Sequence, residues 1–156
     1  MDFSYQLPDN FLSDAAPGIK KETIDFKKTE LPEYDGLYAC ILDNVLTPQE
    51  CSHLIRAVEA RTDGKWEQAM INVGNNQQML NTSYRSCGRI IWDDRDVVAK
   101  LWGRIQDQVP EIADWKFGAC TTRSGLKKPA RVYKMTRLNE RMRFLSYVEG
   151  NYFRRQ

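Results

Sequence analysis

The sequence predicts a domain of the α+β class, in which amphipathic helices pack against a sheet. Three features carry this prediction: an apolar, strand-like run that leads directly into a capped helix, a second helical pattern that stops before a proline, and an alternating run near the C-terminus. Residues 1–36 contain Pro8, Pro17 and Pro32 and have no sustained periodicity. We therefore expect a loosely ordered N-terminal arm at 1–36, followed by one domain at 37–156.

The first strand and the first helix are predicted between residues 37 and 61. The run Leu37 to Leu46 is apolar and β-branched, as in a buried strand. The run Thr47 to Glu50 then supplies a capping threonine, a proline at the first helical position and a glutamate in the first turn. The helix is expected to continue to about Arg61 and to stop at Asp63-Gly64. Its buried face should hold Cys51, Leu54, Ile55 and Val58, which are three and four residues apart.

The middle of the chain predicts further short strands and a second helix. Residues 66–73 alternate in polarity, and 74–76 (Gly-Asn-Asn) is a turn signal. Residues 88–92 are suited to another short extended segment. An aspartate at 93 or 94 can cap a second helix, whose apolar residues keep helical spacing as far as Pro110.

The last third of the chain predicts a loop and then a strand. Residues 115–129 are rich in glycine, lysine, serine and threonine, and we expect a loop there. Residues 141–148 alternate, and 149–151 (Glu-Gly-Asn) is the following turn. One face of this strand should carry Arg141, Arg143, Leu145 and Tyr147, and the other face Met142, Phe144, Ser146 and Val148.

Composition excludes several classes of protein. The chain has 156 residues, of which 42% are hydrophobic and 28% charged, and it contains no apolar run of about 18 residues that would cross a membrane. The N-terminus has neither a basic nor an apolar leader segment, so we expect a cytoplasmic or nuclear protein without a membrane partner. The four cysteines are far apart and form no C-x-x-C pair, which favours reduced thiols.

Basic residues dominate the C-terminal third, although the net charge is only +2. After residue 115, only Glu140 and Glu149 oppose them. This imbalance is compatible with a surface for nucleic acid or for an acidic protein, or with an ordinary solvated face of a domain. The basic residues are Lys116, Arg123, Lys127, Lys128, Arg131, Lys134, Arg137, Arg141, Arg143, Arg154 and Arg155.

Few residues offer catalytic or metal chemistry of their own. The single histidine, His53, lies in the first predicted helix, and we expect it to be a partly exposed helix residue. The cysteines and carboxylates have no metal-ligand spacing, and no phosphate-loop, dinucleotide or hydrolase-elbow motif is present. The aspartates at 93, 94 and 96 stand where a helix begins, which explains them without acid–base chemistry.

A longer pattern resembles a known family. The run Arg137 to Phe153 is similar to the segment L-N-x-x-x-R-F-x-x-Y-x-x-G-x-x-F of prolyl 4-hydroxylase-like dioxygenases, which use 2-oxoglutarate and Fe(II). In that family, two variable residues and then the iron-binding H-x-D motif follow; here Gln156 stands where the histidine would be. The runs 42–51 and 84–94 also resemble the family's opening strand with its capped helix and its Arg-rich strand. The resemblance thus covers roughly residues 37–156.

The resemblance implies a fold, a chemistry and site residues. The fold would be N-terminal helices packed on the early strands of an incomplete double-stranded β-helix (jelly roll) over residues 37–156. Intact relatives hydroxylate a peptide or protein side chain with Fe(II), 2-oxoglutarate and ascorbate. Tyr147 would hydrogen-bond 2-oxoglutarate and Phe153 would line its pocket, whereas without the resemblance Tyr147 reads as an ordinary strand aromatic. None of the three metal ligands is present, Gln156 being at the first position, so we expect neither Fe(II) binding nor catalytic residues in this chain.

Two hypotheses of different classes follow. In the first, the chain is the N-terminal part of such a dioxygenase, truncated before H-x-D and inactive as written. It would fold marginally, because the early strands would keep unpaired edges. In the second, the chain is a non-enzymatic binding module that uses its basic C-terminal third on an acidic protein or on nucleic acid.

Overall fold

The protein is a mixed α and β chain, as the sequence predicts, and its sheets are small and antiparallel. The computed structural model describes residues 4–13, 18–75, 77–117, 120–121 and 127–154. The chain divides into two compact units, which we describe separately. Unit 1 comprises Met1–Phe11, Pro48–Arg95 and Asn139–Gln156, and unit 2 comprises Leu12–Thr47 and Asp96–Leu138.

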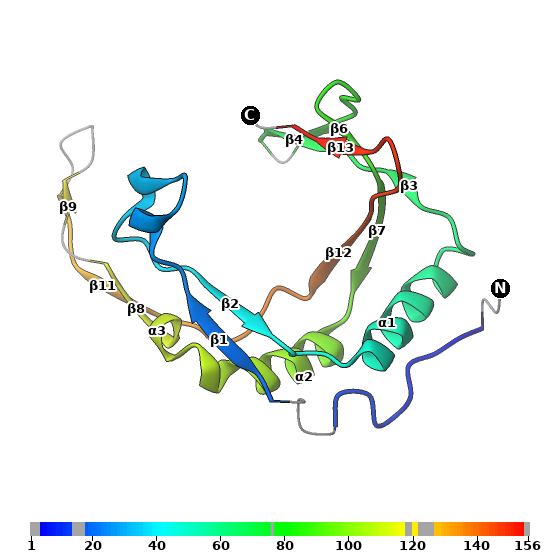
Figure 1. Cartoon of the computed structure of the whole chain (residues 1–156), viewed down its shortest axis with the longest axis horizontal. Helices are drawn as coiled ribbons and strands as arrows, with labels where there is room; N and C mark the ends of the chain where they lie inside the picture. Colours follow the sequence, from blue (N-terminus) through cyan, green and yellow to red (C-terminus); the bar gives the residue numbers. More distant parts are fainter. Residues whose placement is uncertain (1–3, 14–17, 76, 118–119, 122–126, 155–156) are drawn as a thin grey trace. The chain divides into compact units, whose positions relative to one another are not determined.

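The described residues of unit 1 form one helix and three small sheets (Figure 1). The largest sheet has the strand order β12-β7-β3, and the other two pair β13 with β6 and β4 with β5, all antiparallel. Its elements are α1 (Pro48–Ala60), β3 (Glu67–Gln68), β4 (Ile71–Gly74), β5 (Gln77–Met79), β6 (Arg85–Ser86), β7 (Gly88–Asp93), β12 (Arg141–Ser146) and β13 (Tyr152–Phe153).

The core of unit 1 lies between α1 and one face of β7. Ile90 and Trp92 are buried on this face of β7, and Ala57 and Val58 are the buried residues of α1, which contacts β7. Strand β12 contributes Phe144, whose ring stacks on Trp92 with the ring centroids 6.2 Å apart. An alternating strand and a helical stripe thus bury their apolar residues against each other.

The alternation predicted for β12 is confirmed, because its residues are exposed and half-buried in turn. The second face of the sheet is largely charged. Arg141 donates two hydrogen bonds to the Asp93 carboxylate, of 2.9 and 2.7 Å, and Arg89 pairs with Glu67 at 2.9 Å. This face carries Arg89, Ile91 and Asp93 of β7 together with Arg141, Arg143 and Leu145 of β12.

Helix α1 has the predicted limits, but its predicted buried face is partly wrong. After the helix the chain turns at Asp63 and Gly64, both with positive φ. Val58 is buried as expected, whereas Cys51 and Ile55 are exposed. The buried residues of the helix, Ala57 and Val58, lie near its C-terminal end, and Leu54, one turn earlier, is half-buried.

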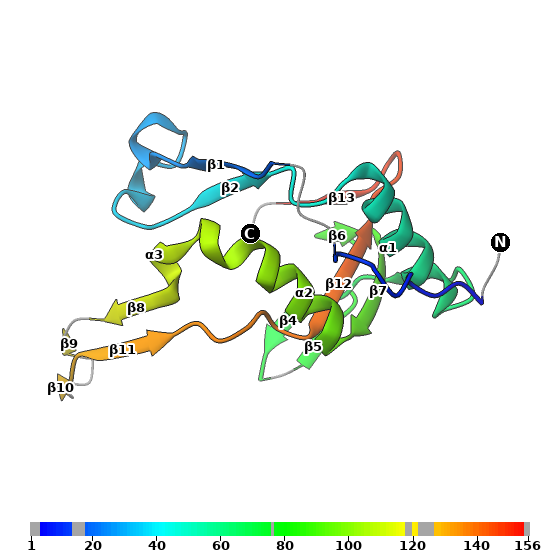
Figure 2. The ribbon, with the colours of Figure 1, turned by 90° about the horizontal axis from the view of Figure 1, so that it is seen from below.

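Unit 2 contains strand pairs and short helices (Figure 2). Strand β1 pairs with β2, β8 with β11, and β9 with β10, all antiparallel. Helix α2 begins at Arg95, the last residue of its segment of unit 1, and continues into unit 2. The elements are β1 (Lys20–Thr23), η1 (Phe26–Lys28), η2 (Pro32–Tyr34), β2 (Cys40–Asp43), α2 (Arg95–Ile105), η3 (Gln106–Gln108), α3 (Pro110–Ala113), β8 (Asp114–Phe117), β9 (Cys120–Thr121), β10 (Lys127–Lys128) and β11 (Arg131–Lys134).

Three expectations about unit 2 need correction. The strand expected at 37–46 shrinks to β2 and is not buried, because in the described chain its only strand partner is β1. The second helix becomes 3-10 after Ile105, although Val109 is buried as its spacing suggested. The segment 115–129, expected to be a loop, contributes to three strands: β8, β9 and β10.

The N-terminal segment 1–36 contains β1 and two 3-10 helices, η1 and η2. The pairing of β1 with β2 runs from Lys20 opposite Asp43 to Thr23 opposite Cys40. Among the described residues, no helix is long and apolar enough to cross a membrane.

Candidate functional site

The two residues that the resemblance selects, Tyr147 and Phe153, lie on either side of one turn. Tyr147 follows β12 directly, and Phe153 ends β13. Between them, Gly150 adopts a positive φ of 85°, and the Asn151 amide donates to the Val148 carbonyl at 2.9 Å. The turn allows β13 to pair with β6, where Phe153 stands opposite Arg85.

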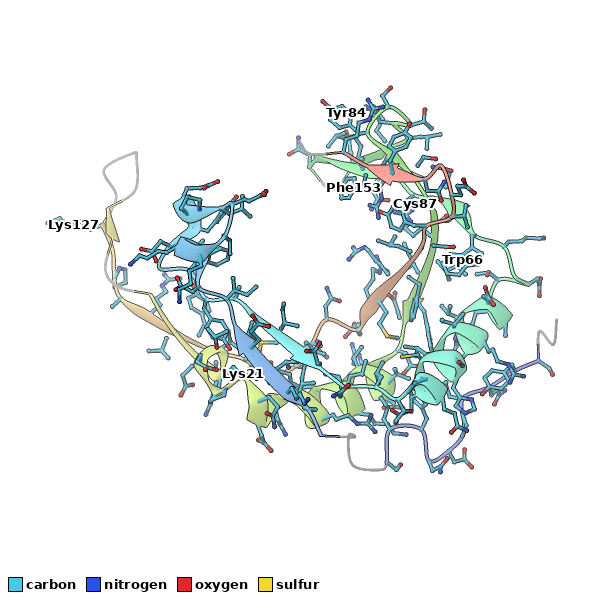
Figure 3. All side chains as sticks on the ribbon, in the orientation of Figure 1. Lys21, Trp66, Tyr84, Cys87, Lys127 and Phe153 are labelled. Carbon is cyan, nitrogen blue, oxygen red and sulfur yellow. The ribbon has the colours of Figure 1, made fainter. Side chains whose placement is uncertain are left out.

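Arg85 and Cys87 complete a cluster with these two aromatic residues. The Arg85 guanidinium lies over the Phe153 ring, 4.7 Å from its centroid. Its Nε donates to Cys87 Sγ at 3.2 Å, and Cys87 is only 1% exposed. Figure 3 shows Cys87 and Phe153 in the same part of unit 1, close to β13. We call Arg85, Cys87, Tyr147 and Phe153 the Arg85 cluster.

Tyr147 joins the cluster through its hydroxyl. Hydrogen bonding to the Cys87 thiol, followed by desolvation, raises the pKa of Tyr147, and the nearby Arg85 opposes this rise. The hydroxyl therefore keeps its proton at neutral pH and remains able to donate a hydrogen bond. The side chain is 47% exposed, so a small molecule can reach it.

Arg85 is a half-buried cation. Within the described residues, no carboxylate forms an ion pair with it. Its Nε donates to Cys87, and a hydrogen bond also links the guanidinium to the Tyr147 hydroxyl; the guanidinium carries further N–H donors beyond these two contacts. A guanidinium beside a protonated phenol is suited to a carboxylate, which accepts charge-assisted hydrogen bonds from both. The cluster can thus bind a small organic anion.

The described residues do not fit an iron site. No group of three or more His, Cys, Asp or Glu side chains comes together in the described part of the chain. His53 is half-buried on α1, as expected, and a hydrogen bond joins its Nδ1 to the Tyr5 hydroxyl. Gln156, the residue at the first family ligand position, lies outside the described residues.

A second polar cluster, in unit 2, was not anticipated from the sequence. Lys21 Nζ lies 2.6 and 2.7 Å from the two carboxylate oxygens of Glu111, and the Tyr38 hydroxyl donates to the same carboxylate at 3.0 Å. Hydrogen bonding to Cys40, with desolvation, raises the pKa of Tyr38 to about 12. Because the charges of Lys21 and Glu111 neutralise each other, this cluster has a structural explanation and offers no uncompensated charge to a ligand.

Sequence reasoning selected Tyr147 and Phe153 but missed Arg85 and Cys87 as site residues. The available signal was the resemblance of the run 84–94 to the Arg-rich strand of the family. It did not indicate that β6 would pair with β13 and bring Arg85 to Phe153. Only the strand pairing joins the two segments.

Comparisons of the chain with protein family models, with curated proteins and with solved structures find no match.

Proposed function

We propose that the chain is the N-terminal part of a prolyl 4-hydroxylase-like dioxygenase domain, and that the Arg85 cluster forms one wall of its 2-oxoglutarate pocket. The intact enzyme would hydroxylate a peptide or protein side chain. The chain as given would contribute to binding of the co-substrate and would not catalyse the reaction.

One observation carries the proposal: Tyr147 and Phe153, chosen by resemblance, meet a half-buried arginine without a carboxylate partner among the described residues. 2-Oxoglutarate is a dicarboxylate, and binding one of its carboxylates would neutralise Arg85. In this pose Arg85 and the Tyr147 hydroxyl donate to the carboxylate, while the Phe153 ring holds the guanidinium in place.

The proposal extends to the fold. The sheet β12-β7-β3, covered on one face by α1, would be the beginning of a jelly roll, and its second face would line the interior. The order of elements supports this, because a capped helix precedes β7 and the run from β12 to β13 carries the family-like motif.

Binding of 2-oxoglutarate without metal provides the direct test. In a titration followed by NMR or calorimetry, we expect Arg85→Gln to weaken binding about 10- to 150-fold, because a charge-assisted hydrogen bond contributes roughly 1.5–3 kcal/mol. Tyr147→Phe should weaken it about 2- to 12-fold, since a neutral hydrogen bond contributes roughly 0.5–1.5 kcal/mol. 2-Oxobutyrate, which lacks the far carboxylate, should bind less tightly than 2-oxoglutarate if Arg85 contacts that carboxylate.

Two control variants remove the same groups elsewhere. Arg131→Gln removes an exposed arginine from β11 in unit 2, and Tyr34→Phe removes an exposed hydroxyl in unit 2. If Arg131→Gln weakens binding as much as Arg85→Gln, the effect is general charge attraction and the pocket is refuted. An absence of any 2-oxoglutarate binding to the parent chain would refute it as well.

The family part of the proposal has a separate test. The transcript can be sequenced across and beyond the codon of Gln156, and a form with histidine at position 156 and aspartate two residues later is the expected result. A locus with no such continuation would contradict the dioxygenase assignment, even if the Arg85 cluster bound an anion.

A further inference from the structure

A second feature of the chain is a long basic segment that the proposed dioxygenase function leaves unused. From Trp115 to Leu138 the chain contains no aspartate or glutamate. The same segment contains Lys116, Arg123, Lys127, Lys128, Arg131, Lys134 and Arg137. Since the whole protein has a net charge of only +2, the positive charge is concentrated here.

The segment folds into an antiparallel ribbon in unit 2. Strand β8 pairs with β11, and β9 pairs with β10 farther along the same two chain segments, as Figure 2 shows. We call β8, β9, β10 and β11 the basic ribbon. All four residues of β11 are exposed, and Lys127, labelled in Figure 3, is exposed on β10.

Three described cations of the ribbon lack the ion pairs that several other cations of the chain form. Lys21 and Arg141 are paired with carboxylates at 2.6 and 2.7 Å. By contrast, Lys127, Arg131 and Lys134 form no ion pair within the described part of the protein. Arg131 and Lys134 project from opposite faces of β11, and Lys134 stands opposite Asp114 of β8. Together with Lys127 they still give the ribbon a positive potential that attracts a polyanion.

An aromatic side chain lies among these cations. Tyr133 is 52% exposed and is two residues from Arg131 on β11. Residues two apart on a strand project from the same face and are about 6.8 Å apart along it, so a cation and a ring stand side by side. A cation beside an exposed ring matches a nucleotide, in which a phosphate adjoins a base with a stacking face.

We propose that the basic ribbon binds single-stranded nucleic acid, with Lys127, Arg131 and Lys134 contacting phosphates and Tyr133 stacking on a base. A single strand is favoured over a duplex because its bases are free to stack on Tyr133, whereas paired bases are already stacked. An acidic protein would satisfy the charges but gives the exposed ring no comparable partner. This binding site does not depend on the proposed dioxygenase function.

The test measures binding of a fluorescent single-stranded oligonucleotide of about 20 nucleotides to the full chain, by anisotropy, between about 50 and 200 mM salt. Replacing Lys127, Arg131 and Lys134 together by glutamine should reduce the slope of log K against log salt by about 2, because each phosphate contact on a single strand contributes about 0.7. Tyr133→Ala should weaken binding roughly fivefold to a hundredfold with little change in the slope, since stacking is not ionic.

A charge-matched control separates the ribbon from the net charge. Glutamine at Lys20, Lys65 and Arg143 removes the same charge from exposed positions outside the ribbon and should change the slope far less than the ribbon variant. Circular dichroism confirms that each variant keeps its secondary structure, and a single Arg131→Gln variant replaces the triple variant if the latter unfolds.

Three outcomes would overturn the proposal. The first is no binding of the oligonucleotide at about 50 mM salt. The second is tighter binding of the corresponding duplex, which would place the ribbon against paired nucleic acid. The third is equal binding of polyglutamate together with an unaltered affinity of Tyr133→Ala, which would identify an acidic protein as the partner.

Discussion

Replacing Ile90 by alanine tests the packing of β7 against α1. Ile90 is 2% exposed, whereas its neighbour Ile91, on the opposite face of the strand, is 36% exposed. Ile90→Ala removes three carbon atoms from a buried site; at about 0.8 kcal/mol each this is roughly 2.4 kcal/mol, and the cavity adds to it. We expect a loss of about 3–4 kcal/mol of unfolding free energy. Ile91→Ala should cost about 1.5 kcal/mol or less, because water can fill the space it leaves.

The two variants are compared by urea denaturation followed through tryptophan fluorescence. Thermal unfolding gives a second readout. A difference of about 2 kcal/mol corresponds to a separation of roughly 4–8 °C in Tm for a chain of this size. If Ile90→Ala leaves no folded protein, Ile90→Val is used, with an expected cost of about 0.5–1.5 kcal/mol. The reasoning is refuted if Ile91→Ala costs as much as Ile90→Ala. That result would reverse the two faces of the sheet and place Leu145 in the core.

Three further predictions concern titration and packing. The pKa of Tyr38 is about 12 in the folded chain, above its ordinary value of 10.0. Because folding favours the protonated phenol, Tyr38 contributes stability below pH 10.0, and this contribution is lost as the pH rises through about 12. Cys40→Ala should lower this pKa in an ultraviolet absorbance titration, and an unchanged midpoint would contradict the assigned cause. The hydrogen bond from Arg141 holds the pKa of Asp93 below its usual value. The contribution of the Asp93 carboxylate to folding stability is therefore present at neutral pH and is lost as the pH falls through the folded pKa. An NMR titration of the Arg141→Gln variant should show that the pKa of Asp93 rises. Gly88→Ala should lower the free energy of unfolding by about 1–3 kcal/mol in a denaturation experiment, because the new Cβ would lie 3.0 Å from the Cβ of Trp66. An unchanged unfolding free energy would mean that the backbone moves freely to make room.

Some of the fold follows from local sequence signals. The proline at 48 and the glycine at 64 mark the two ends of α1, because one favours a first helical turn and the other a positive φ after the last. The alternation of 141–146 predicts β12 for a similar reason, since side chains project alternately from the two faces of any strand. These are properties of short segments and need no distant partner.

Burial could not be predicted in the same way. Val58 and Ile55 are both apolar residues of α1, yet Val58 is buried and Ile55 is exposed. The strand at 40–43 has the composition of a core strand but is paired only with β1 in the described chain. Whether an apolar side chain is covered depends on which other element reaches it, and periodicity does not contain that information.

The candidate site shows the same division between local and long-range information. The sequence by itself determined the alternating strand β12, the turn after it and the family-like motif that selected Tyr147 and Phe153. Only the tertiary structure placed Arg85 over Phe153 and Cys87 beside Tyr147. The first two residues, 68 positions apart, meet through the pairing of β6 with β13, and the other two, 60 positions apart, meet where the pairing of β7 with β12 ends. Likewise, the sequence determined that the segment after residue 115 is basic, and the pairing of β8 with β11 made it a ribbon instead of a loop. The physical reason is that strands are completed by hydrogen bonds to distant residues, whereas helices and turns are completed by their neighbours.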